Sequence, residues 1–174
     1  MSKTFKLLML LPAAALLFTG CLSRTPAAKM YVLPSAQAAS VVPGQRGRIA
    51  FQLPAYLQRT EMRLFDASSG EIRPCKGGLW AAPLHELLSE ALAGQLAGCT
   101  ATVACASFAP DFNGEFHAGG RFILKRADGT EVSGDFAFTL PPPEGLPRLS
   151  PAALARQYAD AIRLLATQVN KTDD

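Results

Sequence analysis

The sequence predicts an α/β fold, a three-layer sandwich in which a mixed β-sheet is covered by two main amphipathic helices. Two segments, 84–97 and 151–169, have apolar residues at helical spacing. Several short segments alternate polar and apolar residues and are separated by Pro or Gly, which is typical of strands. Two helices alone bury little apolar surface, so we expect them to pack on a sheet.

The segment that precedes the middle helix predicts strands and one helical turn. The strands are expected at 30–34, 46–53 and 61–65, and the turn at 55–59. Ser68-Ser69-Gly70 has turn chemistry, so 71–75 should return as a short hairpin partner. Pro74 cannot donate a ladder hydrogen bond, which places this last strand at a sheet edge.

The middle of the chain predicts a helix and then a strand. Pro83 suits the first helical position and Gly98 the position after the last one. A leucine-rich stripe between them, at i, i+3, i+4, i+7 and i+8, predicts a helix over 84–97 with one buried face. Residues 100–108 are rich in small and β-branched side chains and predict a strand, and 109–114 predict a turn.

A hairpin and a final helix complete the predicted fold. Residues 115–126 and 130–140 flank Ala127-Asp128-Gly129, a strong hairpin signal, and their alternation predicts one buried face. Glycines within these arms indicate bends, bulges or close packing. After a stiff linker over 141–147, Ser150 should cap the last helix and Pro151 open it. Its buried face is expected to carry Leu154, Tyr158, Ile162, Leu165 and Val169.

The N-terminus predicts export and lipid attachment. Lys3 and Lys6 precede an apolar run over 7–18, and Thr19-Gly20-Cys21 then matches a lipobox, with Phe18 where Leu is usual. The alternative is a Cys that merely ends an apolar export segment. The lipobox predicts a signal peptide over 1–20 and acylation of Cys21, with fatty acids such as palmitate. Leu22, in place of Asp, indicates the outer membrane, facing the periplasm.

The remaining chain predicts one domain on a short tether. Residues 21–29 form the lipidated tether, 30–170 the single domain and 171–174 a frayed tail. The tether reaches at most about 30 Å when extended, so the domain must stay close to its leaflet. The mature chain has 15 basic and 14 acidic residues, interspersed, which does not favour a nucleic-acid partner. No second stretch approaches the ~20 apolar residues of a spanning helix, so we expect lipid alone to anchor the domain.

Few residues suggest catalysis. The chain has only His85 and His117, and we expect both to be solvent-exposed. Glu86 and Glu90 lie one helical turn apart and could form a carboxylate pair, although a solvated helix face is the favoured interpretation. No Ser occurs in a Gly-x-Ser-x-Gly setting. The sequence therefore predicts no enzyme, no metal and no cofactor.

Three cysteines remain besides Cys21. Cys99 and Cys105 lie along one predicted strand, about 20 Å apart, too far for a disulfide. Pairing of Cys75 with either of them stays open. The favoured alternative is that all three are small buried apolar residues.

Two short motifs suggest a core or a partner surface. Trp80, just before the middle helix, either closes the core or is an exposed aromatic anchor, and the pair Tyr56 and Leu57 has the same two alternatives. The candidate interface residues are Tyr56, Leu57, Leu79, Trp80, Pro83 and Leu84.

Taken in order, the motifs resemble a known family. After the lipidated Cys come Tyr31-Val32-Leu33-Pro34, then the segment 53–59 (LPAYLQR), then 79–84 (LWAAPL) and the 84–97 helix. Together they resemble the ABC-type transport auxiliary lipoproteins of the PqiC type, over about residues 21–170. The stretch between Arg59 and Trp80, which carries Pro74 and Cys75, departs from the family pattern.

The resemblance implies a three-layer α/β fold and a non-enzymatic role at the outer membrane. The expected role is docking or receiving for a lipid-transport ABC system whose MCE-domain subunit crosses the periplasm. Such a system moves phospholipid or other hydrophobic compounds and supports envelope integrity. The implied partners are the membrane, the MCE subunit and further copies of the chain in a ring. The alternatives are a structural or assembly lipoprotein that never touches cargo, and a small-molecule-binding lipoprotein with a closed apolar pocket.

Overall fold

The computed structural model describes residues 28–33, 46–96 and 98–171. The predicted signal peptide, Cys21, most of the tether and the end of the tail lie outside the described residues. The elements, in chain order, are β1 (Lys29–Tyr31), β2 (Arg48–Gln52), η1 (Ala55–Leu57), β3 (Glu61–Asp66), β4 (Glu71–Trp80), α2 (Leu84–Ala93), β5 (Thr100–Pro110), β6 (Phe116–Lys125), β7 (Glu131–Leu140) and α3 (Pro151–Lys171).

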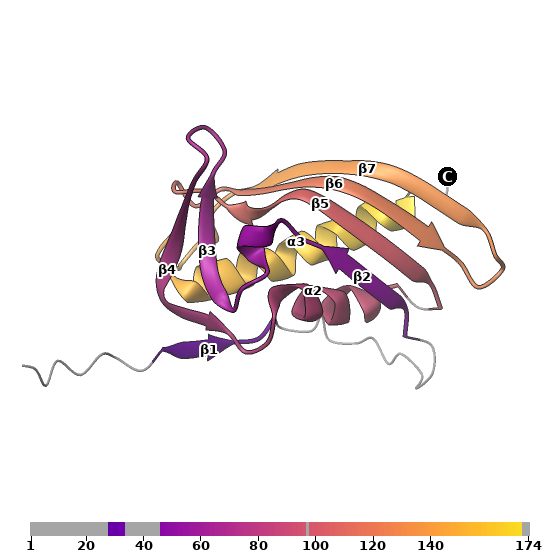
Figure 1. Cartoon of the computed structure of the whole chain (residues 1–174), viewed down its shortest axis with the longest axis horizontal. Coiled ribbons are helices and arrows are strands. Elements are labelled where there is room, and N and C mark those ends of the chain that lie inside the picture. The colour runs from indigo at the N-terminus through magenta and orange to yellow at the C-terminus, as the bar shows by residue number, and fades with distance from the viewer. Residues whose placement is uncertain (1–27, 34–45, 97, 172–174) are drawn as a thin grey trace, which may run out of the picture.

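The predicted α/β sandwich is confirmed, and its strands are divided between two mixed sheets. One sheet has the order β1-β4-β3 and the other has the order β2-β5-β6-β7. In each sheet an N-terminal strand pairs in parallel, β1 with β4 and β2 with β5, while the remaining neighbours are antiparallel. The β3–β4 hairpin stands at one end of the larger sheet (Figure 1).

Both helices lie on the same side of the four-stranded sheet (Figure 1). Helix α3 contacts β5, β6 and β7 of that sheet and β4 of the smaller one, whereas α2 contacts β2 and α3. The predicted apolar stripe of α3 is buried at all five positions, Leu154, Tyr158, Ile162, Leu165 and Val169. Ser150 caps this helix as expected, because its Oγ accepts a hydrogen bond from the Ala153 amide at 3.2 Å.

An aromatic cluster forms the centre of the core. The Tyr158 ring on α3 meets the edge of Phe116 at 4.9 Å and of Trp80 at 5.2 Å between centroids. Phe116 in turn makes an edge contact with Phe108 at 5.2 Å. These perpendicular arrangements are the ones that aromatic quadrupoles favour. The cluster therefore joins both sheets to α3.

Strand β4 corrects one prediction. It continues to Trp80 and lies between β1 and β3, so it is the middle strand of its sheet rather than an edge strand. Pro74 is tolerated because β1 pairs only with Gly78, Leu79 and Trp80. Beside Pro74 the β4 backbone has a strand partner on one side alone, so no ladder bond is lost.

Two other predicted boundaries differ from the structure. Helix α2 ends at Ala93 instead of 97, because Gly94 has poor helix propensity. After it the chain tightens into a turn in which the Gln95 amide donates a hydrogen bond to the Leu92 carbonyl at 2.9 Å. Strand β5 continues through Pro110, so the predicted 109–114 turn starts at Asp111. There the Asp111 amide closes the hairpin on the Glu115 carbonyl at 2.8 Å.

None of the helices in the described ranges is long and apolar enough to cross a membrane.

Candidate functional site

The predicted interface residues lie mainly in the core. Trp80, Leu57 and Leu84 are 3%, 2% and 1% exposed, so they cannot act as exposed anchors, and this part of the prediction is corrected. Trp80 takes the core alternative, against Tyr158. Leu79, Pro83 and Tyr56 are half-buried. Three of the six predicted interface residues are therefore core residues.

Tyr56 is held by stacking. Its ring lies on Phe65 of β3 at 5.0 Å between centroids and 25° between planes, which joins η1 to the β3–β4 hairpin. Burial, with a smaller contribution from the Cys105 thiol, raises the pKa of Tyr56 to about 12. This phenol stays neutral at physiological pH and supplies no charge to a site.

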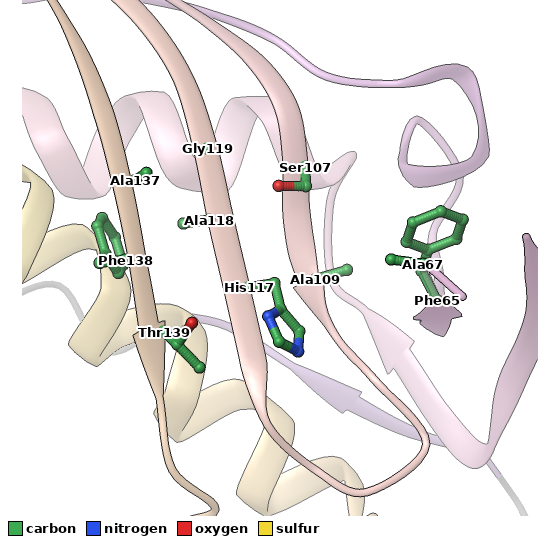
Figure 2. A pocket seen from close by; sticks show the side chains of 10 residues that line it. All are labelled: Phe65, Ala67, Ser107, Ala109, His117, Ala118, Gly119, Ala137, Phe138 and Thr139. Atoms are coloured by element: carbon green, nitrogen blue, oxygen red, sulfur yellow. The ribbon is translucent and has the colours of Figure 1, made fainter.

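A hollow lies on the face of the four-stranded sheet that points away from α3, which we call the outer face. Figure 2 shows this outer hollow, bounded at one end by Phe65 and at the other by Phe138 and Thr139. Its volume is about 500 Å³. The residues that line it are Phe65, Ala67, Ser107, Ala109, His117, Ala118, Gly119, Ala137, Phe138 and Thr139.

The shape of the hollow follows from small residues and a bulge. Strand β5 has a register shift between Cys105 and Ser107, opposite Gly119 and Gly120 of β6. A Cβ on Gly120 would lie 2.2 Å from the Ala104 carbonyl oxygen, so only glycine permits this approach. The predicted bulge or close packing at these glycines is confirmed. Three polar side chains, Ser107, His117 and Thr139, face an otherwise apolar surface (Figure 2).

A group of potential ligands lies at the β5–β6 turn beside the outer hollow. One ligand atom each from Asp111, Glu115 and His117 lies within 4.8 Å of the others. Asp111 is oriented by its own turn, because Oδ1 accepts hydrogen bonds from the amides of Asn113 and Glu115, both at 2.9 Å. Its Oδ2 lies 3.4 Å from His117 Nε2. These three side chains could hold a divalent cation, since carboxylates and imidazole are common ligands.

The electrostatics of this turn favour a charged Asp111. Burial raises the pKa of the Asp111 carboxyl, but the backbone amides of Glu115 and Asn113 and the side chain of His117 outweigh it, so the net pKa is lowered. The sequence analysis missed this group because it considered Cys and His spacing alone. The signal was the D-x-x-x-E-x-H pattern across a turn.

The turn is tied to the far side of the sheet by one buried amide. Gln157 of α3 is 1% exposed, and its Nε2 donates to the Gly114 carbonyl at 2.6 Å and to the Pro141 carbonyl at 3.2 Å. Both ends of the β6–β7 hairpin are thereby fixed to the helix. Two of the strands that carry the outer hollow are therefore tied to α3 at one end.

The other candidate residues do not converge on a site. His85 and His117 are half-buried rather than fully exposed, and His85 Nε2 lies 4.0 Å from Glu86. Glu86 and Glu90 are exposed, which agrees with a solvated helix face. Cys75 is a free thiol, and its Sγ lies 3.2 Å from the Leu149 carbonyl oxygen. Neither of the two disulfides that the sequence left open for Cys75 is formed, which agrees with the favoured alternative for Cys75, a small buried apolar residue.

Cys105 lacks the character of a nucleophile. Burial raises the pKa of its thiol to about 12, and the thiolate is the reactive form.

Comparison with known proteins supports the fold alone. No family model matches the chain, and no curated protein matches it. A crystal structure of an uncharacterized protein is similar with a TM-score of 0.58 and 17% identity, over 83% of this chain and 99% of that one. The crystal structure of protein XCC0632 from Xanthomonas campestris, of family DUF330, is similar with a TM-score of 0.50 and 17% identity, over 83% and 91%.

Proposed function

We propose that this chain is an outer-membrane lipoprotein that serves as a docking or receiving component of an MCE-type ABC transport system. The observation that carries the proposal is the lipobox Thr19-Gly20-Cys21, followed in order by the motifs at 31–34, 53–59 and 79–84. The domain contributes binding surface rather than catalysis. A small α/β domain on a short lipidated tether is suited to be a docking site for a partner that brings phospholipid or another hydrophobic compound.

The arrangement of side chains supports a binding role. In the part of the chain that the structure describes, each cysteine is at least half-buried, and the two histidines are on different elements. The outer hollow offers an open, mostly apolar surface. An open hollow suits a side chain or strand of a protein partner better than the closed pocket of a small-molecule carrier. With Trp80 in the core, the outer hollow takes its place as the proposed docking surface.

The test is capture of the MCE-domain subunit in cells. Ala137 is exposed in the floor of the hollow, so A137R should fill it and reduce crosslinking about tenfold or more. The matched control is S133R, an exposed residue of the same strand and face outside the hollow, which should crosslink like the wild type.

Three results decide the proposal. Mass spectrometry of the mature N-terminal peptide should show three acyl chains on Cys21, and an unmodified thiol would contradict the anchor. Equal crosslinking by A137R and S133R would move the docking surface away from the hollow. Failure of the wild type to crosslink to any MCE-domain subunit would contradict the function itself.

A further inference from the structure

Two large apolar side chains are exposed at the end of β1, close to the predicted lipid anchor: Met30 in the strand and Val32 just after it. Met30 and Val32 are 74% and 63% exposed, whereas the other exposed large apolar residues, Ile72, Ile123 and Leu149, are only 38% to 42% exposed. Exposed and core-facing residues alternate here, because Tyr31 packs against the core and Leu33 is buried, while Met30 and Val32 on either side of Tyr31 are mostly exposed.

The surroundings leave this side open. Strand β1 stands at the end of its sheet in the order β1-β4-β3, so among the described strands none covers its free edge. Val32 also borders a hollow of about 220 Å³ with Leu33, Leu87, Glu90 and Ala91. We define the β1 ridge as Met30 and Val32.

The tether limits where the ridge can be. Eight residues, 22–29, lie between Cys21 and Met30, and even a fully extended chain of that length spans only roughly 30 Å. That distance is comparable with the thickness of a bilayer's hydrocarbon core. If acyl chains on Cys21 are in the leaflet, the ridge lies within reach of the membrane surface.

The small size of the β1 ridge favours insertion into lipid over binding to a protein. A stable protein interface takes about 20 to 30 residues from each side, far more than two side chains. An already anchored domain, in contrast, has lost most of its translational freedom, so a small apolar insertion adds to the binding. Lys29, exposed beside the ridge, has a long stem whose ammonium can reach headgroup phosphates.

We propose that the β1 ridge inserts into the interfacial region of the bilayer that holds the lipid anchor, and so orients the domain with β1 toward the leaflet. This inference rests on the proposed lipid anchor at Cys21. It leaves the outer face of the four-stranded sheet free for a partner. Glu90, at the border of the adjoining hollow, keeps α2 at the water side of the headgroups.

The test is depth-dependent fluorescence quenching of the mature lipidated protein. M30W and V32W place a new indole on the ridge, and I123W places one on the outer face, where Ile123 is also exposed. The native Trp80 is buried and gives the same background in all three. The vesicles contain phosphatidylethanolamine and phosphatidylglycerol at a ratio of roughly 3:1, with brominated acyl chains. M30W and V32W should lose about half of the added emission, and I123W almost none.

The controls separate the possible failures. Mass spectrometry of the same samples reports acylation of Cys21, and its absence would overturn both the anchor and this inference. Acylated protein in which M30W, V32W and I123W are quenched equally, or not at all, would overturn the inference alone. A blue shift of M30W emission that follows protein concentration without vesicles would assign the ridge to a second copy of the chain, and would also overturn it.

Discussion

On the four-stranded sheet, the face toward α3 carries large aromatic residues, whereas the outer face carries small and polar ones. Phe108 of β5 and Phe116 and Phe122 of β6 are buried on the helix side, whereas Ser107 of β5, Gly119 of β6 and Ala137 of β7 lie on the outer face. The helix side specifies the fold through packing. The outer face supplies little stabilisation, so its residues are free to serve a partner, and substitutions on the two faces should separate stability from binding.

The largest expected effect is on the helix side of β6. Phe116 is fully buried and makes edge contacts with Phe108 and Tyr158, so F116A should lower the free energy of unfolding by about 3–5 kcal/mol. Urea denaturation measures it. The control is I123A, since Ile123 is exposed on the outer face of the same strand and should change stability by less than about 0.5 kcal/mol. Similar losses of stability for F116A and I123A would contradict the proposed difference between the two faces of the sheet.

An intermediate effect is expected where two glycines face opposite sides. A Cβ on Gly120 would lie 2.2 Å from the Ala104 carbonyl oxygen, so G120A must push two strands apart and should cost about 1–3 kcal/mol. A Cβ on Gly119 would lie 3.3 Å from the Ser107 hydroxyl oxygen, which can rotate away, and 3.8 Å from the Phe136 carbonyl oxygen, which is an ordinary contact. G119A should therefore cost less than about 1 kcal/mol in thermal unfolding. A larger loss for G119A would place the tight contact on the outer face.

The smallest effect on stability is expected at the Tyr158 hydroxyl, on the helix side of the sheet. The Tyr158 hydroxyl is buried without a hydrogen-bond partner among the described residues, and burial, with smaller contributions from Tyr56 and Cys105, raises its pKa well above the ordinary value. Y158F keeps the ring contacts and removes a buried polar atom, so stability should stay within about 0.5 kcal/mol or rise slightly. A loss above about 1 kcal/mol would show that the hydroxyl is bonded in solution.

Sequence reasoning located most elements because local patterns determine them. The α3 stripe, the Ser150 cap, the Ala127-Asp128-Gly129 hairpin and the turn at η1 all agree with the structure. The division into two sheets was not predicted. It depends on the pairing of β1 with β4 and of β2 with β5, and no local pattern encodes pairing between such distant segments.

The candidate site was harder to predict than the fold. Trp80 has the same sequence pattern whether it fills a core or a partner's pocket, and only the position of Tyr158 decides between them. The outer hollow arises where four strands and a bulge meet, so its lining is scattered from Phe65 to Thr139. Asp111, Glu115 and His117 lie within seven residues of the sequence, but Cys and His spacing alone does not reveal a group of two carboxylates and one imidazole.

The parallel pairing of β1 and β2 sets an order of assembly. The partners of Met30 and Ile49 are Leu79 and Ala101, each roughly 50 residues further along the chain. Strands β5, β6 and β7, in contrast, follow one another through short turns, and contacts of low sequence separation form fastest. A growing chain must hold both early strands unpaired until their neighbours have been synthesised. The C-terminal meander is therefore the natural nucleus, and the N-terminal strands are the last to join.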